Sequence, residues 1–215
     1  GDDAAAVAEN RRRVLAALGR EDALDCLLVP NQVHGDHVAV VTSASSEELE
    51  RVRAEIAEGA DAIVCTVQGV PVMLCYADCV PVILACSAGF AVIHSGWKGT
   101  IARISAKAAV RLSEVTGCST SEMQAYIGPH IQADEYEVSE ELMERFDAEF
   151  GWSEAGSTRL LDLTRAIVQA LVEVGVPAAA IEDTGLSTVA DNDRFFSYRL
   201  EAGVCGRHAA VALQG

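Results

Sequence analysis

Apolar residues are spaced in two different ways along this chain. In five stretches they recur every three to four positions, the spacing of a helix that buries one face. Ser45 and Glu48 form a capping box at the start of one such stretch, and Gly19, Gly59 and Gly175 are placed to end helices. The predicted helices span residues 3–18, 45–58, 100–115, 139–150 and 161–174.

The middle of the chain has a second pattern, in which short continuous apolar runs are separated by Gly, Pro and Asp. Such runs predict strands that are buried on both faces. Helices and strands are mixed without a regular βαβ rhythm, so the pattern predicts one α/β or α+β layered domain and leaves its topology open. The predicted strands span residues 26–29, 62–67, 72–77, 80–86, 90–93, 194–199 and 209–213.

Composition excludes several classes of partner. The formal net charge of −16 argues against nucleic acid and against acidic membrane surfaces, because both need clustered Lys and Arg. No apolar run is long enough to span a membrane.

The seven cysteines are scattered and form no CxxC pair, which favours free thiols in a reducing cytoplasm over a disulfide scaffold. The oligomeric state is left open.

Three turn-like sites carry residues that can bind a metal. His34 lies in Gln-Val-His-Gly after a predicted strand, Cys79 lies in Ala-Asp-Cys-Val-Pro between two apolar runs, and His94 precedes Ser-Gly-Trp-Lys-Gly. All three are at strand ends, where neighbouring strands can bring side chains together. Two imidazoles and a thiolate suit zinc or copper. Taken alone, each residue is more often part of ordinary core or turn structure, and the spacing matches no regular zinc motif.

The phrases ADAIVCT, YADCVPVIL, AVIHSGWKGT, IGPHI with YEV, and RFFSYR follow one another along the chain. Together they resemble the family variously called multicopper polyphenol oxidase (laccase), peptidoglycan editing factor and bacterial purine nucleoside phosphorylase. The resemblance implies a layered α-β-β-α single domain with mixed sheets. It also implies that His34, Cys79 and His94 bind the metal, usually zinc, with copper as the alternative.

The chain departs from the family pattern in several places. Family members usually carry an FSTR-like, glycine-rich strand segment ahead of the GDD…ENRRR stretch, so we expect residues 1–215 to form the catalytic domain without that segment's substrate contacts. Ser187-Thr188 stands where the family has a Cys-Thr motif, Arg199-Leu200 where it has two arginines, and Cys205-Gly206-Arg207 at its TGR-like end. These differences leave the three metal ligands intact.

The resemblance implies phosphorolysis of adenosine, inosine, guanosine or methylthioadenosine, with adenosine deamination as a possible second activity. The partners would then be a nucleoside and phosphate. Lys98, in a glycine-flanked turn ahead of a predicted helix, is one candidate for binding phosphate, and Arg199 is a second. Both are equally typical of solvated surface charges.

Two other functions compete with this one. A copper polyphenol oxidase would need a blue copper and a trinuclear cluster, and five histidines without an HxH motif are too few for both. A cysteine hydrolase of cell-wall editing would use Cys79 as nucleophile and His94 as base. Asp78 could be an acid/base partner or a turn residue, with the turn preferred. We expect His37 and His130 to be accessory.

Overall fold

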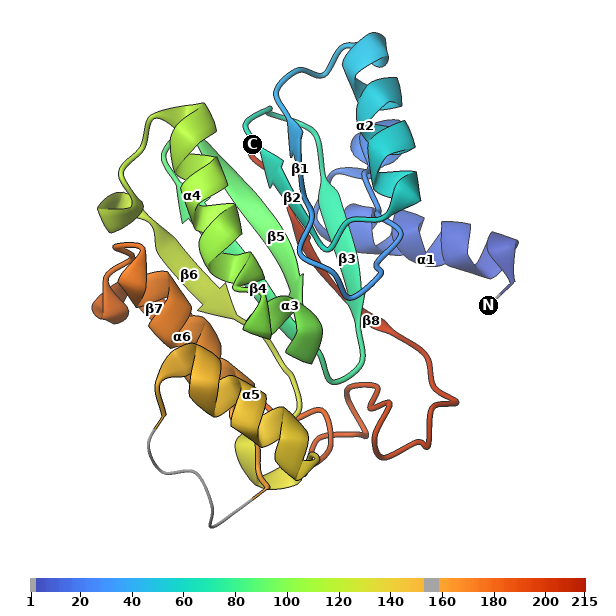
Figure 1. The fold of residues 1–215 in the computed structure, drawn as a ribbon. Helices are drawn as coiled ribbons and strands as arrows, with labels where there is room; N and C mark the ends of the chain where they lie inside the picture. The colour runs from blue at the N-terminus through green and yellow to red at the C-terminus, as the bar shows by residue number, and fades with distance from the viewer. Residues whose placement is uncertain (1–2, 153–158) are drawn as a thin grey trace.

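The computed structural model describes residues 3–152 and 159–215, and its centre is a six-stranded mixed sheet (Figure 1). The strand order is β1-β2-β5-β4-β6-β7. The two outer pairs are parallel, and the central pairings are antiparallel. The strands are β1 Val38–Val41, β2 Ala62–Cys65, β4 Val80–Cys86, β5 Gly89–Ser95, β6 Gln124–Ile127 and β7 Ile181–Asp183.

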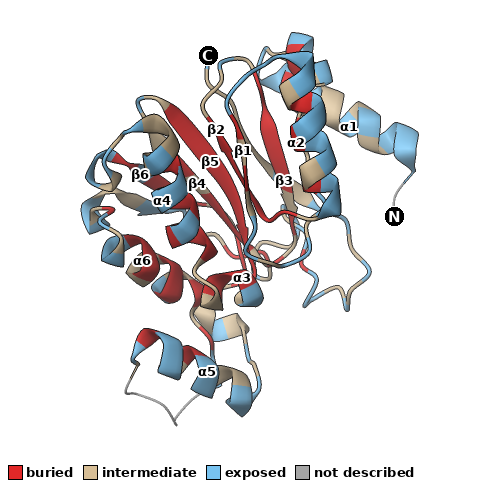
Figure 2. Ribbon diagram, turned by 45° about the horizontal axis from the view of Figure 1, so that its top comes forward, coloured by how far each residue is buried: buried red, intermediate tan, exposed pale blue. Residues whose placement is uncertain are grey.

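A second, two-stranded antiparallel sheet packs on one face of the large sheet. It consists of β3 Val72–Tyr76 and β8 His208–Ala212. Alternate residues of the central strands face opposite layers: on β5, Ala91 and Ile93 belong to one core and Phe90 and Val92 to the other. The central strands are therefore buried on both sides (Figure 2), which explains why they appear in the sequence as continuous apolar runs.

Helices form the two outer layers. Ahead of the large sheet in Figure 1 lie α4 and α6, with α3 and α5 near its lower end, while α1 and α2 lie on the side of the small sheet. The predicted α-β-β-α layering with mixed sheets is confirmed. No helix among the described residues is long and apolar enough to cross a membrane. The helices are α1 Ala4–Ala17, α2 Ser46–Glu58, α3 Trp97–Ile101, α4 Ile104–Thr116, α5 Glu140–Phe150 and α6 Leu163–Glu173.

The single helix predicted over 100–115 is two helices in the structure. Arg103 interrupts it with a left-handed backbone conformation (φ 61°). The guanidinium of Arg103 forms ion pairs with Glu149 and Glu173 and lies 4.8 Å from the ring centroid of Phe150. Contacts with α5 and α6 therefore hold a break that the local apolar spacing does not indicate.

Two strand predictions were wrong. Residues 194–199 form turns, because their N–H groups bond locally or to side chains: Arg194 N donates to Asp191 O, and Ser197 N donates to Glu201 Oε1. Residues 26–29 contribute only one bridge, between Leu28 and Val72, after a 3-10 helix. Three further strands, β1, β6 and β7, were not predicted, because they have only three or four residues each.

Candidate metal centre

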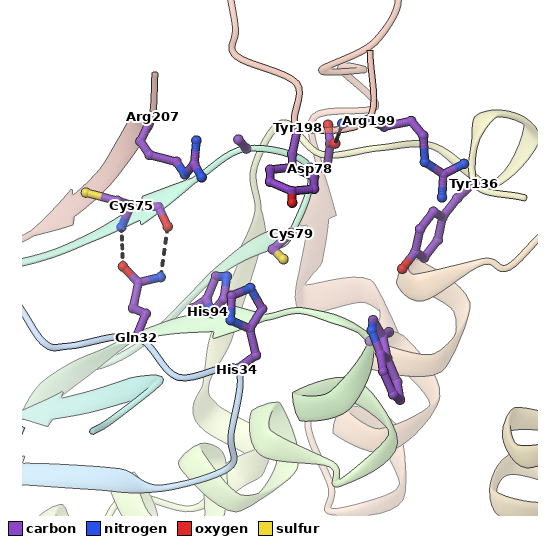
Figure 3. Close-up of a pocket in the computed structure, with 12 residues that line it drawn as sticks. Gln32, His34, Cys75, Asp78, Cys79, His94, Tyr136, Tyr198, Arg199 and Arg207 are labelled. Carbon is purple, nitrogen blue, oxygen red and sulfur yellow. Dashed lines mark hydrogen bonds between the residues drawn. The ribbon is translucent and has the colours of Figure 1, made fainter. Parts of the chain in front are cut away.

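Three side chains that are distant in the sequence meet at one end of the large sheet. His34 lies in the loop before β1, Cys79 in the turn between β3 and β4, and His94 near the end of β5. One nitrogen of each imidazole and the Cys79 sulfur all lie within 4.8 Å of one another (Figure 3). The structure therefore brings together the three residues selected from the sequence as metal ligands.

Gly96 leaves the space that this group occupies. A Cβ at this position would lie 2.9 Å from Cys79 Sγ, closer than real Cβ contacts, and 3.2 Å from His34 Cδ2, closer than most of them. The backbone of Gly96 has φ −77°, so the residue is needed for space and not for an unusual conformation. Two imidazoles and a thiolate in this spacing fit the donor set of a tetrahedral metal site with one open position.

The carboxylate of Asp61, immediately before β2, holds two parts of the centre together. Its side chain is fully buried. Oδ1 lies 2.7 Å from His94 Nδ1 and accepts from the N–H of His34 at 3.0 Å, while Oδ2 accepts from the N–H groups of Gly35 at 2.7 Å and Val33 at 3.2 Å. One side chain thus fixes both the His34 turn and the ring of His94.

Asp61 also selects the tautomer of His94. An ionised carboxylate only accepts hydrogen bonds, so His94 Nδ1 carries a proton and Nε2 is left to face Cys79. Burial would raise the pKa of Asp61, but hydrogen bonds from His94 and the turn amides hold it below its usual value. Burial likewise lowers the pKa of His94, and the neighbouring Asp61 and Cys79 reverse this and raise it to about 9.

The Cys79 thiol is poised to lose its proton. Burial alone would raise its pKa, yet hydrogen bonds to His34 and His94 lower the pKa to about 7. A thiolate is the form that binds a metal ion and also the form that acts as a nucleophile. The cluster therefore supplies a deprotonated sulfur near neutral pH by its own geometry.

The loop that carries His34 is bound to the small sheet by its neighbour Gln32. The amide of Gln32 accepts from Cys75 N and donates to Cys75 O, both at 2.8 Å. His34 itself has a left-handed backbone (φ 59°), a conformation that non-glycine residues adopt only when the surroundings impose it. Gln32 on one side and Asp61 on the other provide that constraint.

The three donors lie in the wall of a cavity of about 640 Å³ (Figure 3). Aromatic rings and two guanidinium groups form much of the remaining wall. The lining residues are Gln32, His34, Cys75, Ala77, Asp78, Cys79, His94, Trp97, Tyr136, Tyr198, Arg199 and Arg207.

Asp78 ties the C-terminal part of the chain to this cavity. Its carboxylate accepts from Thr188 Oγ1 at 2.7 Å and from the backbone N–H of Arg199 at 2.6 Å. Its left-handed backbone conformation (φ 81°) forms part of the turn that carries Cys79. The structure thus favours a role in chain positioning, close to the predicted turn role and different from that of an acid/base partner.

The two arginines of the cavity are not paired with carboxylates. Arg199 donates to the carbonyl of Glu137 at 3.1 Å, and Arg207 donates to the carbonyls of Cys205 and Gly206. Neither forms an ion pair with any residue that the structure describes. The cavity wall of this acidic protein therefore carries two guanidinium groups that no ion pair among the described residues engages.

The other candidates from the sequence lie away from the cavity. Lys98 is exposed, and its Nζ lies 5.5 Å from the ring centroid of the adjacent Trp97. His37 contacts Glu55, and His130 is buried with Thr164 Oγ1 2.7 Å from its Nε2. Of the two predicted phosphate-binding residues, only Arg199 reaches the cavity wall.

Several residues that hold the three ligands in place or line their cavity were not predicted from the sequence. Asp61 carried one signal, since an acidic residue directly before a fully apolar strand must find hydrogen-bond donors if it is buried. Tyr136 and Tyr198 lie inside the quoted family phrases, and Gln32 lies in the Gln-Val-His-Gly turn, but the three were given no role. Arg207 was noted only in the TGR-like end, because its place in the cavity wall depends on how the C-terminal stretch folds back.

The fold and site define a layered α/β protein with a His-Cys-His centre. A family model described as multi-copper polyphenol oxidoreductase laccase matches residues 1–214. The chain therefore belongs to this family.

Curated relatives carry names of purine enzymes. A protein called adenosine deaminase RL5, from an unknown prokaryotic organism, is 37% identical over 93% of this chain and 78% of its own length. The purine nucleoside phosphorylase of Deinococcus radiodurans is 36% identical over 98% of this chain and 78% of its own length. The crystal structure of YlmD from Geobacillus stearothermophilus superimposes with a TM-score of 0.86 at 26% identity, covering 100% of this chain and 83% of that one.

Replacing Asp61 by Asn tests its part in the centre. Loss of the charge should weaken metal binding about 10- to 100-fold, because the orientation and basicity of His94 depend on its carboxylate partner. Unfolding free energy should fall by roughly 1–3 kcal/mol, since buried N–H groups lose acceptors. Chelator competition and urea unfolding measure the two effects. Asp36→Asn, on an exposed aspartate bound to Lys107, is the control. Wild-type metal affinity in Asp61→Asn would contradict this role.

Gly96→Ala tests the space around the sulfur. The added Cβ would meet Cys79 Sγ at 2.9 Å, so we expect metal content to fall by at least about half while the circular dichroism spectrum is unchanged. Gly128→Ala is a matched control, because the nearest atoms to its Cβ would belong to Pro81, at 3.2 Å, and not to a metal ligand. Equal metal content in the two variants would show that the gap at Gly96 is not part of the site.

Proposed function

We propose that this protein is a metal-dependent enzyme acting on purine nucleosides, in which His34, Cys79 and His94 hold a single zinc ion. The observation that carries the proposal is the meeting of these three donors in the wall of a cavity with aromatic rings and unpaired guanidinium groups. The names of the curated relatives support the same substrate class.

The donor set favours zinc, with copper as the alternative occupant. Three protein ligands leave one tetrahedral position open, which is the arrangement of catalytic and not structural zinc sites. Zinc held there supplies a Lewis acid that polarises an oxygen atom at neutral pH. A multicopper mechanism is disfavoured by the donors, because His37 and His130 are bound elsewhere and lie outside the cavity.

The cavity wall provides faces for a flat base. Trp97, Tyr136 and Tyr198 contribute aromatic rings, and stacking on such rings accepts any purine. Tyr136 is held beneath the guanidinium of Arg199, 5.1 Å from its ring centroid, which keeps the ring in place. Because stacking does not depend on which purine is bound, the cavity would accommodate adenosine, inosine, guanosine and methylthioadenosine alike.

Phosphate would be bound by the two arginines. Arg199 and Arg207 have donors free for an anion, and a planar guanidinium matches two phosphate oxygens at once. With phosphate held against the sugar, the reaction is phosphorolysis: a phosphate oxygen bonds to the anomeric carbon, and the base leaves with the electrons of the glycosidic bond. Adenosine deamination, in which no phosphate takes part, is proposed as a second activity of the same site.

A cysteine hydrolase is the second candidate, and one observation favours it. Asp61, His94 and Cys79 are linked in series, as the orienting acid, base and nucleophile of a hydrolytic triad are. The same geometry also serves metal binding. The two functions exclude each other, because a bound metal ion would occupy the sulfur that a hydrolase needs free. Metal content therefore separates the two functions.

Cys79→Ser is the first test of the proposed function. A hydroxyl is a much poorer zinc ligand than a thiolate, so metal content and phosphate-dependent cleavage of adenosine and inosine should fall together, activity by at least about 100-fold. Elemental analysis and release of free base measure them, with Cys26→Ser as a control on a cysteine far from the cavity.

Other outcomes identify the alternatives. Full metal content with lost turnover in Cys79→Ser, or a metal-free wild type that hydrolyses its substrate, would favour the cysteine hydrolase. Ammonia release from adenosine without any need for phosphate would favour deamination.

Arginine variants test the phosphate site. Arg199→Gln and Arg207→Gln should each raise KM for phosphate about 10-fold or more, the loss expected for a charged hydrogen bond of roughly 1.5–3 kcal/mol. Lys98→Gln should change it less than about twofold, because Lys98 does not line the cavity. Arg194→Gln is a control in the same C-terminal stretch. A large effect of Lys98→Gln with none from either arginine would place phosphate outside the cavity.

A further inference from the structure

Two cysteines that the metal centre does not use lie together at the far end of β4. Cys86 is the last residue of β4, the strand that begins next to Cys79 at the metal centre. Cys118 follows Gly117, which ends α4 with a left-handed φ of 75°. Both are free and partly accessible to solvent. The turn at Gly117 thus returns the chain from α4 to the end of the sheet.

The two thiols share one polar environment. Each thiol affects the pKa of the other. Cys86 Sγ is 3.9 Å from Thr116 Oγ1, and Cys118 Sγ is 3.6 Å from Ser87 Oγ.

The backbone around Cys118 is held on both sides. Thr116 Oγ1 accepts from Cys118 N at 3.2 Å, and Ser113 Oγ donates to Cys118 O at 2.7 Å. Cys118 is therefore kept beside the end of β4 in an ordered turn, and the two sulfurs need little movement to meet.

We propose that Cys86 and Cys118 form an oxidation site that reacts with peroxides and closes to a reversible disulfide bond. Geometry carries this inference: two thiols from different elements border the same group of side chains, Thr116 and Ser87, are accessible to a small oxidant and have no role in the metal centre. It is independent of the function proposed above.

The two thiols differ in a way that assigns their roles. Interactions with Ser87, Cys86 and Thr116 lower the pKa of Cys118, whereas burial raises the pKa of Cys86. The Cys118 thiolate attacks one oxygen of hydrogen peroxide, giving a sulfenic acid and hydroxide. The Cys86 thiol then attacks that sulfur, the disulfide forms and the oxygen leaves as water. Two thiols are oxidised and one peroxide is reduced.

The disulfide would join the β4–β5 hairpin to the end of α4. The closed segment, residues 86–118, contains His94 but places the new bond at the end of β4 opposite to Cys79. The bond restricts the unfolded chain, so the oxidised protein should unfold at a temperature roughly 5–10 °C higher than the reduced one. Metal content should not change, because the ligands are not involved.

The experiment treats the purified, metal-loaded protein with one equivalent of hydrogen peroxide and then maps its cysteines by mass spectrometry. The wild type and the control Cys26→Ser should each lose about 2 Da and yield one peptide pair joining Cys86 to Cys118, both restored by dithiothreitol. Cys86→Ser should instead stop at a sulfenic acid on Cys118, trapped by dimedone. Cys118→Ser should leave Cys86 reduced.

The wild type provides a result that does not depend on any variant folding well. A Cys86–Cys118 peptide pair with a raised melting temperature supports the proposal. Disulfides that join other cysteines, or a Cys118 that stays reduced while Cys26 and Cys205 are oxidised, would overturn it.

Discussion

The buried carboxylate of Asp61 is the group on which the arrangement of the metal centre depends. A carboxylate without access to water is stable only when donors surround it. Here the donors are three consecutive backbone N–H groups of residues 33–35 and the ring of His94. Because the turn and the ring must both face Asp61, they also face each other. The requirement to satisfy one buried charge therefore places His34 beside His94 and leaves the remaining imidazole nitrogen of His94 for Cys79.

A second carboxylate has the corresponding role on the other side of Cys79. Asp78 accepts hydrogen bonds from Thr188 and the backbone of Arg199, which hold the C-terminal stretch against the cavity. The side chains of Arg199 and Arg207 remain without a carboxylate partner among the described residues. An acidic chain thus places two unpaired guanidinium groups in the wall of its cavity. Net charge describes the whole surface, whereas the charges at a site depend on which side chains the fold brings there.

Elements that are determined by the apolar pattern of their own segment could be predicted from the sequence. Elements that depend on hydrogen bonds or packing from distant segments could not. The long runs of β4 and β5 are apolar because layers cover both faces, and this signal is strong in the sequence. The short strand β6 has exposed residues at alternate positions, so too few apolar residues remain to distinguish it from a loop. The stretch 194–199 has strand-like composition, yet its N–H groups bond to nearby turns and to Asp78. Hydrogen-bond partners from distant segments decided these cases.

The sequence by itself determined the layered class of the fold, through the apolar runs, and the identity of the three metal-binding candidates, through residue types at strand ends. Only the tertiary structure decided that His34, Cys79 and His94 meet, that Asp61 aligns them and that Arg207, not Lys98, lines their cavity. The physical reason is that residue type and spacing record what each segment buries along its own length. The position of a side chain relative to a distant segment depends instead on strand order and on which buried polar groups must find one another.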